Sequence, residues 1–362
     1  EMMLYNLLAK FDRRKFSPIV ISLMDKGRFG EAIEKLDIPV YSLGMNRGIP
    51  SFQTITKLIK IVNKLQPDLI QGWMYHGNIA AQFISLLSKQ KIPVLWSIHH
   101  SLHSLSSEKF LTQTLIKLGG FTAKFVRQVA FVSEKSQLQH AKLGYPPQNS
   151  CIIPNGFDTS LFQPSTAIRN QFRQELGLPS NALLIGSIAR YHPMKDHANL
   201  LRAAKILLSN YPEAYFILVG TDVDKENTTL TNLIAELDIS EGIYLLGERR
   251  DIPQIMPALD IVTSSSAFGE AFPLVLGEAM ACAIPCVATD LGDSAWIIGD
   301  TGKIVPIQNP KALATAWQEL ISLGAEGRKT LGEAARNRII NNFSLDSVVA
   351  QYQSLYQQAI EQ

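Results

Sequence analysis

Two successive series of short apolar runs, with helical patterns between them, constrain this chain more than any other feature. The runs lie at residues 18–23, 39–43, 68–73, 93–98 and 129–133 in the first series, and at 183–189, 215–220, 243–247, 260–265, 285–289 and 303–306 in the second. Strands that alternate with helices form βαβ units and parallel sheets. The sequence therefore predicts an α/β fold with two doubly wound, Rossmann-like sheets in tandem.

A turn-rich segment separates the two series. Residues 152–164, IIPNGFDTSLFQP, include Pro154, Asn155 and Gly156, which favour turns. With 362 residues the chain is long enough to bury two cores. We therefore expect a first domain over residues 1–160 and a second over 165–344, with a ligand cleft beyond the carboxyl ends of their strands.

Charge is distributed unevenly along the chain. Residues 1–160 contain 19 Lys and Arg and 10 Asp and Glu, whereas the remaining residues contain 15 and 22. A basic first domain favours an anionic partner, either a membrane surface or an anionic acceptor. The basic and aromatic interleaving that stacks bases is missing, and no apolar run reaches the roughly 18 residues that span a bilayer. We expect a cytoplasmic protein with peripheral contact to the inner face of the membrane and no nucleic-acid partner.

Two glutamates, Glu270 and Glu278, flank the predicted start of a helix. Pro273 suits the first position of a helix, because its missing N–H needs no partner there. Glu270 then precedes the helix and Glu278 lies in its second turn. The N–H groups at such a terminus suit phosphate oxygens, while flanking carboxylates suit hydroxyl groups of a ribose or a sugar. A sugar nucleotide carries both kinds of group.

Residues 270–290, EAFPLVLGEAMACAIPCVATD, resemble the Glu-x7-Glu segment of the retaining glycosyltransferases of the GT-B fold, family 4. The segment IPNGFD at 153–158 is similar to the hinge that follows the first domain in this family. The resemblance covers nearly the whole chain. It implies two Rossmann-like domains with an interdomain cleft, and a last helix, residues 345–362, that packs back on the first domain.

The residues that we expect to bind the donor lie in the second domain. Arg190 and Lys195 follow a strand five residues apart, where both can reach one pyrophosphate, and they match the R-x4-K pair of the family. The resemblance implies that Glu278 binds the ribose hydroxyls and that Glu270 faces the transferred sugar. The remaining expected donor contacts are backbone groups near Phe272, Leu274 and Val275, and Gly247 beside the base.

Three histidines end strands of the first domain. His99 and His100 follow the run at 93–98, and the resemblance implies that a histidine at this position touches the donor sugar. We assign that catalytic role to His99, in the Ser97-Ile98-His99 spacing, and place His100 on the acceptor side. His76, after the run at 68–73, is the second acceptor-side candidate.

The resemblance implies a retaining glycosyltransferase that moves a sugar from a UDP- or GDP-sugar to a glycan or lipid-linked acceptor in cell-surface polysaccharide or glycolipid assembly. Arg190, Lys195 and the helix N-terminus supply the positive potential that a leaving diphosphate needs, so neither a metal nor a cofactor is expected. Asp222 and Asp224 have the D-x-D form of metal-binding glycosyltransferases, but we interpret them as a solvated loop. The alternatives are a GT-B-fold sugar-nucleotide epimerase and a non-catalytic sugar-nucleotide-binding protein.

The chain begins in a helical pattern, over residues 1–16, with no strand before it. A doubly wound domain of this family starts with a central strand and a G-G-x-E loop, and omission of a central strand would leave buried backbone groups unpaired. We therefore expect the intact protein to carry about ten to twenty further residues, enough for one such strand and its loop.

Overall fold

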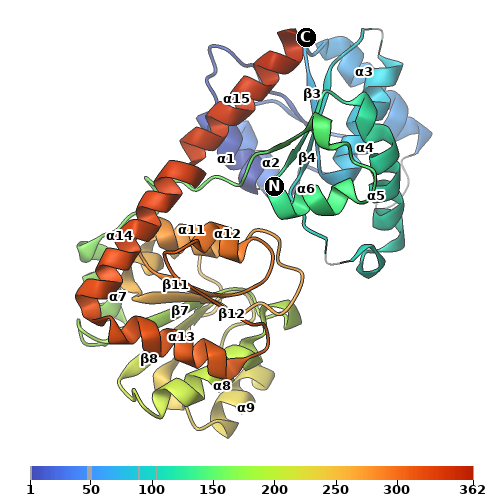
Figure 1. Ribbon diagram of the computed structural model, residues 1–362. Coiled ribbons are helices and arrows are strands. Elements are labelled where there is room, and N and C mark those ends of the chain that lie inside the picture. Colours follow the sequence, from blue (N-terminus) through green and yellow to red (C-terminus); the bar gives the residue numbers. More distant parts are fainter. Residues whose placement is uncertain (1, 47–50, 89, 103, 362) are drawn as a thin grey trace. The chain divides into compact units, whose positions relative to one another are not determined.

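The computed structural model describes residues 2–46, 51–88, 90–102 and 104–361 (Figure 1). The chain divides into two compact units. Unit 1 comprises Glu1–Gly156 with Leu345–Gln362, and unit 2 comprises Phe157–Ser344. Short 3-10 turns lie at Leu105–Ser107, Ala123–Phe125, Pro147–Asn149, Pro193–Lys195, Ser240–Gly242 and Met256–Ala258.

Unit 2 is built on a parallel sheet with the order β12-β11-β10-β7-β8-β9. Its strands are β7 (Leu183–Ile188), β8 (Ala214–Val219), β9 (Ile243–Leu245), β10 (Ile261–Ser264), β11 (Cys286–Thr289) and β12 (Lys303–Val305). The direction in which the chain winds reverses between β7 and β10. A doubly wound sheet binds its ligands beyond the carboxyl ends of the strands at this switch point.

Helices of unit 2 surround the sheet. They are α7 (Thr166–Glu175), α8 (His197–Leu208), α9 (Thr228–Glu236), α10 (Ile252–Ile255), α11 (Leu274–Ala281), α12 (Ser294–Ile298), α13 (Pro310–Ser322) and α14 (Gly324–Phe343). Helices cover both faces of the sheet, which explains why β10 and β11 are buried at every residue. In the core, Trp317 of α13 packs on Phe216 of β8 and donates its Nε1–H to Thr263 Oγ1 at 2.9 Å.

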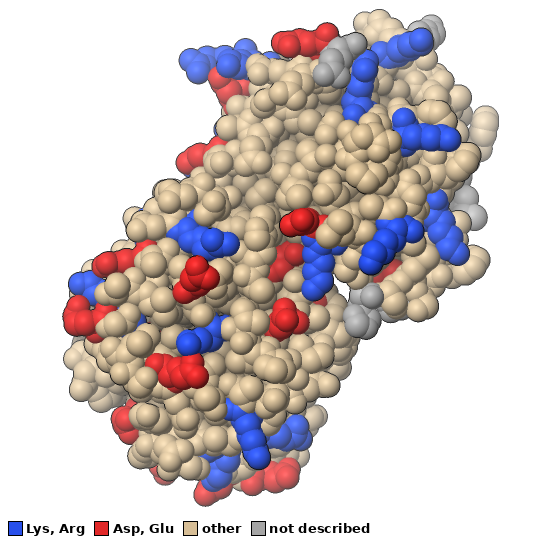
Figure 2. All heavy atoms as spheres, viewed as in Figure 1, with Lys and Arg blue, Asp and Glu red and all other residues tan. Residues whose placement is uncertain are grey.

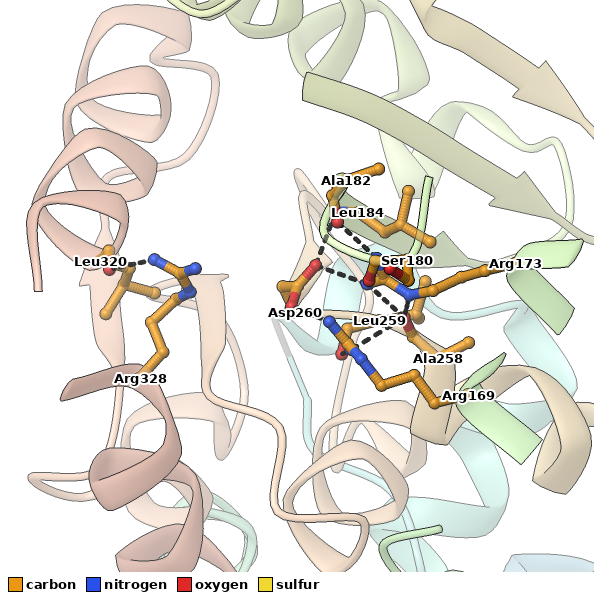
Figure 3. Close-up of polar contacts among 10 residues, drawn as sticks. All are labelled: Arg169, Arg173, Ser180, Ala182, Leu184, Ala258, Leu259, Asp260, Leu320 and Arg328. Carbon is orange, nitrogen blue, oxygen red and sulfur yellow. Dashed lines mark hydrogen bonds and ion pairs between the residues drawn. The ribbon is translucent and has the colours of Figure 1, made fainter. Parts of the chain in front are cut away.

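A buried ionic cluster joins α7 to the amino ends of β7 and β10 (Figure 3). Asp260 accepts from Arg169 at 2.7 Å and from Arg173 at 2.8 Å, one arginine on each carboxylate oxygen. The same carboxylate accepts from the backbone N–H of Leu184 at 2.8 Å, and Arg173 also donates through Nε and Nη2 to the carbonyl oxygen of Ala258. The cluster therefore fixes β10 beside β7, the two strands that meet at the switch point.

Unit 1 contains a parallel sheet of order β3-β4-β5-β6 and a separate parallel pair, β1 and β2. The strands are β1 (Val20–Ser22), β2 (Val40–Ser42), β3 (Ile70–Trp73), β4 (Val94–Ile98), β5 (Gln128–Phe131) and β6 (Ser150–Ile152). The helices are α1 (Met2–Lys10), α2 (Gly27–Glu34), α3 (Phe52–Leu65), α4 (Met74–Leu87), α5 (Phe110–Thr122), α6 (Glu134–Ala141) and α15 (Leu345–Glu361).

The last helix, α15, belongs to the core of unit 1. Val348, Tyr352 and Tyr356 are buried in one cluster with Leu7 of α1 and with Phe11, and the Tyr356 hydroxyl donates to Gln71 of β3. Burial of two tyrosines and this buried polar contact attach the end of the chain to the unit in which it begins.

The predicted strands are confirmed, but several boundaries differ. The first helix ends at Lys10 rather than near residue 16, because Asp12 forms a turn in which its carboxylate accepts from the N–H of Arg14. A short strand, β6, ends at Ile152, the first residue of the predicted turn segment. Pro273 caps α11 and does not start it, so Leu274 is the first helical residue. Glu278 still lies in the second turn.

Candidate functional site

The loops that follow β7 and β10 are joined at the switch point of unit 2. Ser265 Oγ donates to the carbonyl of Lys195 at 2.8 Å, and the N–H of Ala267 donates to the carbonyl of Met194 at 2.8 Å. A cavity of about 10 Å³ lies between the loops, and Ser187, Thr263 and Val275 contribute to its lining. These contacts hold the polar ends of both strands in one place.

Lys195 and Glu270 form an ion pair between these two loops, through Glu270 Oε2. Ser266 Oγ donates to the same carboxylate oxygen at 3.0 Å. The side chains are only 19% and 13% exposed, so solvent screens their attraction weakly. The structure therefore brings together two of the residues that the sequence predicts for the site.

The backbone around Glu270 is held from the loop after β11. The N–H of Asp293 donates to the carbonyl of Ala271 at 2.8 Å. Gly292 adopts a φ of +57°, and a Cβ at this position would come within 2.5 Å of the Glu270 carbonyl oxygen. Glycine fits there because the close approach excludes a Cβ and the left-handed backbone disfavours other residues.

Packing fixes the N-terminus of α11. The ring of Phe272 stacks on Phe157, with centroids 5.9 Å apart, and meets Trp296 edge-on. A Cβ at Gly277 would lie 2.1 Å from the Phe157 ring, so the helix can approach that ring only with glycine there. Phe272 thus has its side chain in the core, and no side chain caps the first turn at Leu274 and Val275. Their backbone N–H groups suit an external anion.

Glu278 is partly buried in the second turn of α11, and burial raises the pKa of its carboxyl to about 7. A buried carboxylate is stabilised by hydroxyl donors, which a ribose supplies. Arg190 is exposed two residues beyond β7.

Gly247 follows β9 with a φ of +65°. Its N–H donates to the Val223 carbonyl and its carbonyl accepts from the Gly220 N–H, both at 2.9 Å. Asp224, beside it, accepts from the N–H groups of Glu226 and Asn227 at 3.1 and 3.2 Å. The Asp224 carboxylate therefore shapes this loop.

His99 of unit 1 follows β4 and is held on two sides. Its ring stacks on Trp73, with centroids 4.7 Å apart and planes at 8°, and its Nδ1 lies 2.9 Å from Asn155 Oδ1. An amide oxygen accepts, so Nδ1 carries the proton. The buried Nε2 has no hydrogen-bond partner among the described residues. Burial lowers the pKa of His99 to about 4, so the ring is neutral near pH 7 and Nε2 is an acceptor.

The other two predicted histidines have different surroundings. His100 directs Nδ1 at the Tyr75 hydroxyl, 3.1 Å away, and Nε2 at Glu108, 3.5 Å away. Tyr75 also meets His140 Nε2 at 2.8 Å. Both nitrogens of His100 thus face protein groups, whereas His76 is exposed in the first turn of α4.

Sequence patterns did not predict several residues of the site. Ser265 and Ser266 had a local signal, because polar residues directly follow the apolar run of β10. Asn155 and Trp73 had none, since the fold brings them to His99 from distant segments. Within the described ranges we find no cluster of three or more His, Cys, Asp or Glu that could hold a metal ion. None of the described helices combines the length and apolarity needed to cross a bilayer.

Comparisons with known proteins show which family the chain belongs to. Residues 168–338 match the family described as "Glycosyl transferases group 1", and residues 1–161 match "Glycosyltransferase Family 4". An Escherichia coli relative, "UDP-Gal:alpha-D-GlcNAc-diphosphoundecaprenol alpha-1,3-galactosyltransferase", is 23% identical over 85% of this chain and 80% of its own. The Bacillus anthracis "N-acetyl-alpha-D-glucosaminyl L-malate synthase" is 28% identical, but over 51% of this chain and 48% of its own.

Two solved structures share the fold. Anabaena Alr3699/HepE in complex with UDP superposes with a TM-score of 0.86 at 23% identity, covering 99% of this chain and 95% of its own. A glycosyltransferase from Rickettsia africae ESF-5 also gives a TM-score of 0.86, at 22% identity, with 99% and 94% covered. The predicted fold class is confirmed.

Proposed function

Because the chain belongs to the group 1, family 4 glycosyltransferases of the GT-B fold, we propose that it transfers a sugar from a nucleotide-sugar donor to an acceptor hydroxyl with retention at the anomeric carbon. The observation that carries this proposal is the arrangement at the switch point of unit 2. Lys195 and Glu270 are paired there, and Glu278 lies in α11, whose first turn has no side-chain cap. These residues and the helix terminus offer a binding partner to each part of a sugar nucleotide: the diphosphate, the sugar and the ribose.

Each donor group has an assigned partner. Arg190, Lys195 and the N–H groups near Phe272, Leu274 and Val275 bind the diphosphate, and they supply positive potential as negative charge grows on it during bond cleavage. Glu278 accepts from the ribose hydroxyls, and Gly247 lies beside the base. We propose no metal requirement, because two cations and a helix terminus already serve the leaving group.

Glu270 and His99 serve the transferred sugar. A diphosphate that attracts Lys195 releases the Glu270 carboxylate, which then stabilises positive charge at the anomeric carbon or accepts from a sugar hydroxyl. The unpartnered Nε2 of His99 accepts a hydrogen bond from another sugar hydroxyl, because the ring is neutral and Nδ1 is already bonded to Asn155.

The donor base and the acceptor are proposed from the relatives. HepE was solved with UDP, and the name of the E. coli relative gives a UDP-sugar and a diphosphoundecaprenol acceptor. These names support a UDP-sugar donor, a lipid-linked acceptor and a role in cell-surface polysaccharide or glycolipid assembly.

Peripheral docking on an anionic membrane is supported by the surface of unit 1 near α5. Phe110, Phe121 and Phe125 are among its exposed apolar residues, and Lys124 Nζ lies 4.8 and 5.1 Å from the ring centroids of Phe121 and Phe125. Exposed aromatic rings beside lysines suit the interface of an anionic membrane. Vesicles that contain anionic lipid should sediment the protein and neutral vesicles should not. Absence of sedimentation with both would end this part of the proposal.

A donor screen followed by product analysis tests the main proposal. UDP-glucose, UDP-galactose, UDP-N-acetylglucosamine and GDP-mannose are compared by thermal shift, and the best ligand is incubated with a lipid-linked acceptor in excess EDTA. NMR should show an anomeric configuration equal to that of the donor. An inverted product, or turnover restored only by Mn²⁺ or Mg²⁺, would contradict the mechanism. Interconversion of donor sugars without an acceptor would indicate an epimerase, and binding without turnover a non-catalytic protein.

A further inference from the structure

A cavity of about 330 Å³ lies in unit 1 between α3, α4, α5 and the segments that follow β1 and β2. Its apolar lining includes Ile55, Leu58, Ile79, Phe83, Leu111 and Leu115. The polar side chains in the lining are those of Thr54 and His76. A water molecule needs two to four polar partners, and two side chains cannot serve a volume equal to roughly ten waters. The cavity is therefore suited to an apolar ligand.

The cavity reaches the surface beside exposed apolar residues. Leu111 and Phe83 contribute to the lining and are themselves partly exposed. Leu86 of α4 and Phe110 of α5 are exposed on the same helices. A hydrocarbon chain that leaves a lipid surface could therefore enter the cavity along apolar side chains, without passing a polar surface.

Charge at this surface favours an anionic ligand. α3, α4 and α5 contain no Asp or Glu, whereas α3 carries Lys57, Lys60 and Lys64, and α5 carries Lys117. Figure 2 shows Lys and Arg side chains spread along the part of unit 1 that contains α5. Lysines on helices that carry no carboxylates attract phosphate groups.

We propose that this cavity binds the hydrocarbon chain of an anionic lipid acceptor, with the phosphate end toward His76 and the lysines. The inference rests on the proposed function, because it assigns the acceptor of that reaction to a lipid phosphate. It adds a site of its own, with an apolar occupant and a lining that lies within unit 1.

The experiment measures binding of decyl phosphate, kept below its micelle concentration, by titration calorimetry. Leu111→Glu is compared with Leu118→Glu. Both leucines lie on α5 and are similarly exposed, at 37% and 42%, but only Leu111 lines the cavity. Both variants change the surface charge equally, so they should lose vesicle binding equally. Leu111→Glu should weaken decyl phosphate binding at least tenfold and Leu118→Glu less than twofold.

A second variant fills the space without adding charge. Ala80→Phe should abolish decyl phosphate binding while UDP binding and the thermal unfolding midpoint stay unchanged. Equal effects of the two leucine variants, or undiminished binding in Ala80→Phe, would overturn the proposal, as would absence of binding to the unmodified protein. The readout is binding alone, so it is independent of whether glycosyl transfer is detected.

Discussion

Lys195 and Glu270 form an ion pair across the switch point of the unit 2 sheet, with one residue on each of the loops that follow β7 and β10. The pair neutralises the lysine that we assign to the diphosphate. A donor must therefore compete with Glu270 for Lys195, and its binding releases a carboxylate beside the sugar. Through this exchange, binding of the nucleotide frees the Glu270 carboxylate to act on the sugar.

Glu270→Gln is expected to bind UDP more tightly, by about fivefold to tenfold, because Lys195 then faces the diphosphate without a competing charge. Transfer should nevertheless fall by about 2 to 4 kcal/mol in kcat/KM, since the released carboxylate is missing. Calorimetry with UDP and steady-state kinetics measure the two effects. The control is Glu319→Gln, which removes an exposed ion pair with Lys303 at 2.6 Å and should change neither. Weaker UDP binding in Glu270→Gln would contradict the exchange.

Arg190→Ala is expected to lower kcat/KM by about 2 to 4 kcal/mol, with a matching loss of UDP affinity, because it removes a cation from the leaving diphosphate. Arg202→Ala is the matched control, as Arg202 is an exposed arginine of the following helix, α8. Donor kinetics that are the same in both variants would remove Arg190 from the site.

Glu278 should make donor affinity depend on pH. Its pKa lies near 7 in the unliganded protein, and ribose hydroxyls prefer the ionised carboxylate, so the pKa falls when the donor binds. Affinity should therefore rise with pH up to about 7 and become constant above it. UDP-glucose is the suitable ligand, because its diphosphate does not titrate in this range. Glu278→Gln should abolish the dependence, and an identical slope in that variant would show that another group is responsible.

The sequence predicted more of unit 2 than of unit 1. Local patterns suffice for β7, β10 and α11, because apolar runs, Pro273 and the flanking polar residues all lie close along the chain. Contacts between distant segments are invisible to such patterns: Asn155 and Trp73 meet His99 only after folding. The Lys195–Glu270 pair is an intermediate case. Both residues were assigned to the site, but their direct contact in the absence of a donor was not predicted.

Asn155→Asp is expected to make activity depend on protonation of His99. The neutral amide leaves the pKa of His99 near 4, whereas a carboxylate at 2.9 Å would favour the imidazolium and raise that pKa toward neutrality. Protonated Nε2 cannot accept a sugar hydroxyl, so kcat should fall as the pH is lowered through the new pKa. Asn155→Ala should reduce kcat without this acid limb. A flat profile for Asn155→Asp between pH 5 and 8, as for the unmodified protein, would argue against Nε2 as the acceptor.

Asp260→Asn is expected to destabilise unit 2 by about 3 to 5 kcal/mol, because it leaves the buried Arg173, which is 1% exposed, without its counter-charge. The carboxylate also accepts from Leu184 N–H, so the change loosens β10 against β7 and should weaken UDP binding as well. Denaturant unfolding and calorimetry measure both effects.

Glu175→Gln, which breaks the exposed pair with Arg249 at 3.4 Å, should cost less than about 1 kcal/mol. Adding Arg173→Met to Asp260→Asn should recover part of the loss, since the unpaired buried charge is then gone. Unchanged stability in Asp260→Asn would mean that the cluster does not hold the two strands together.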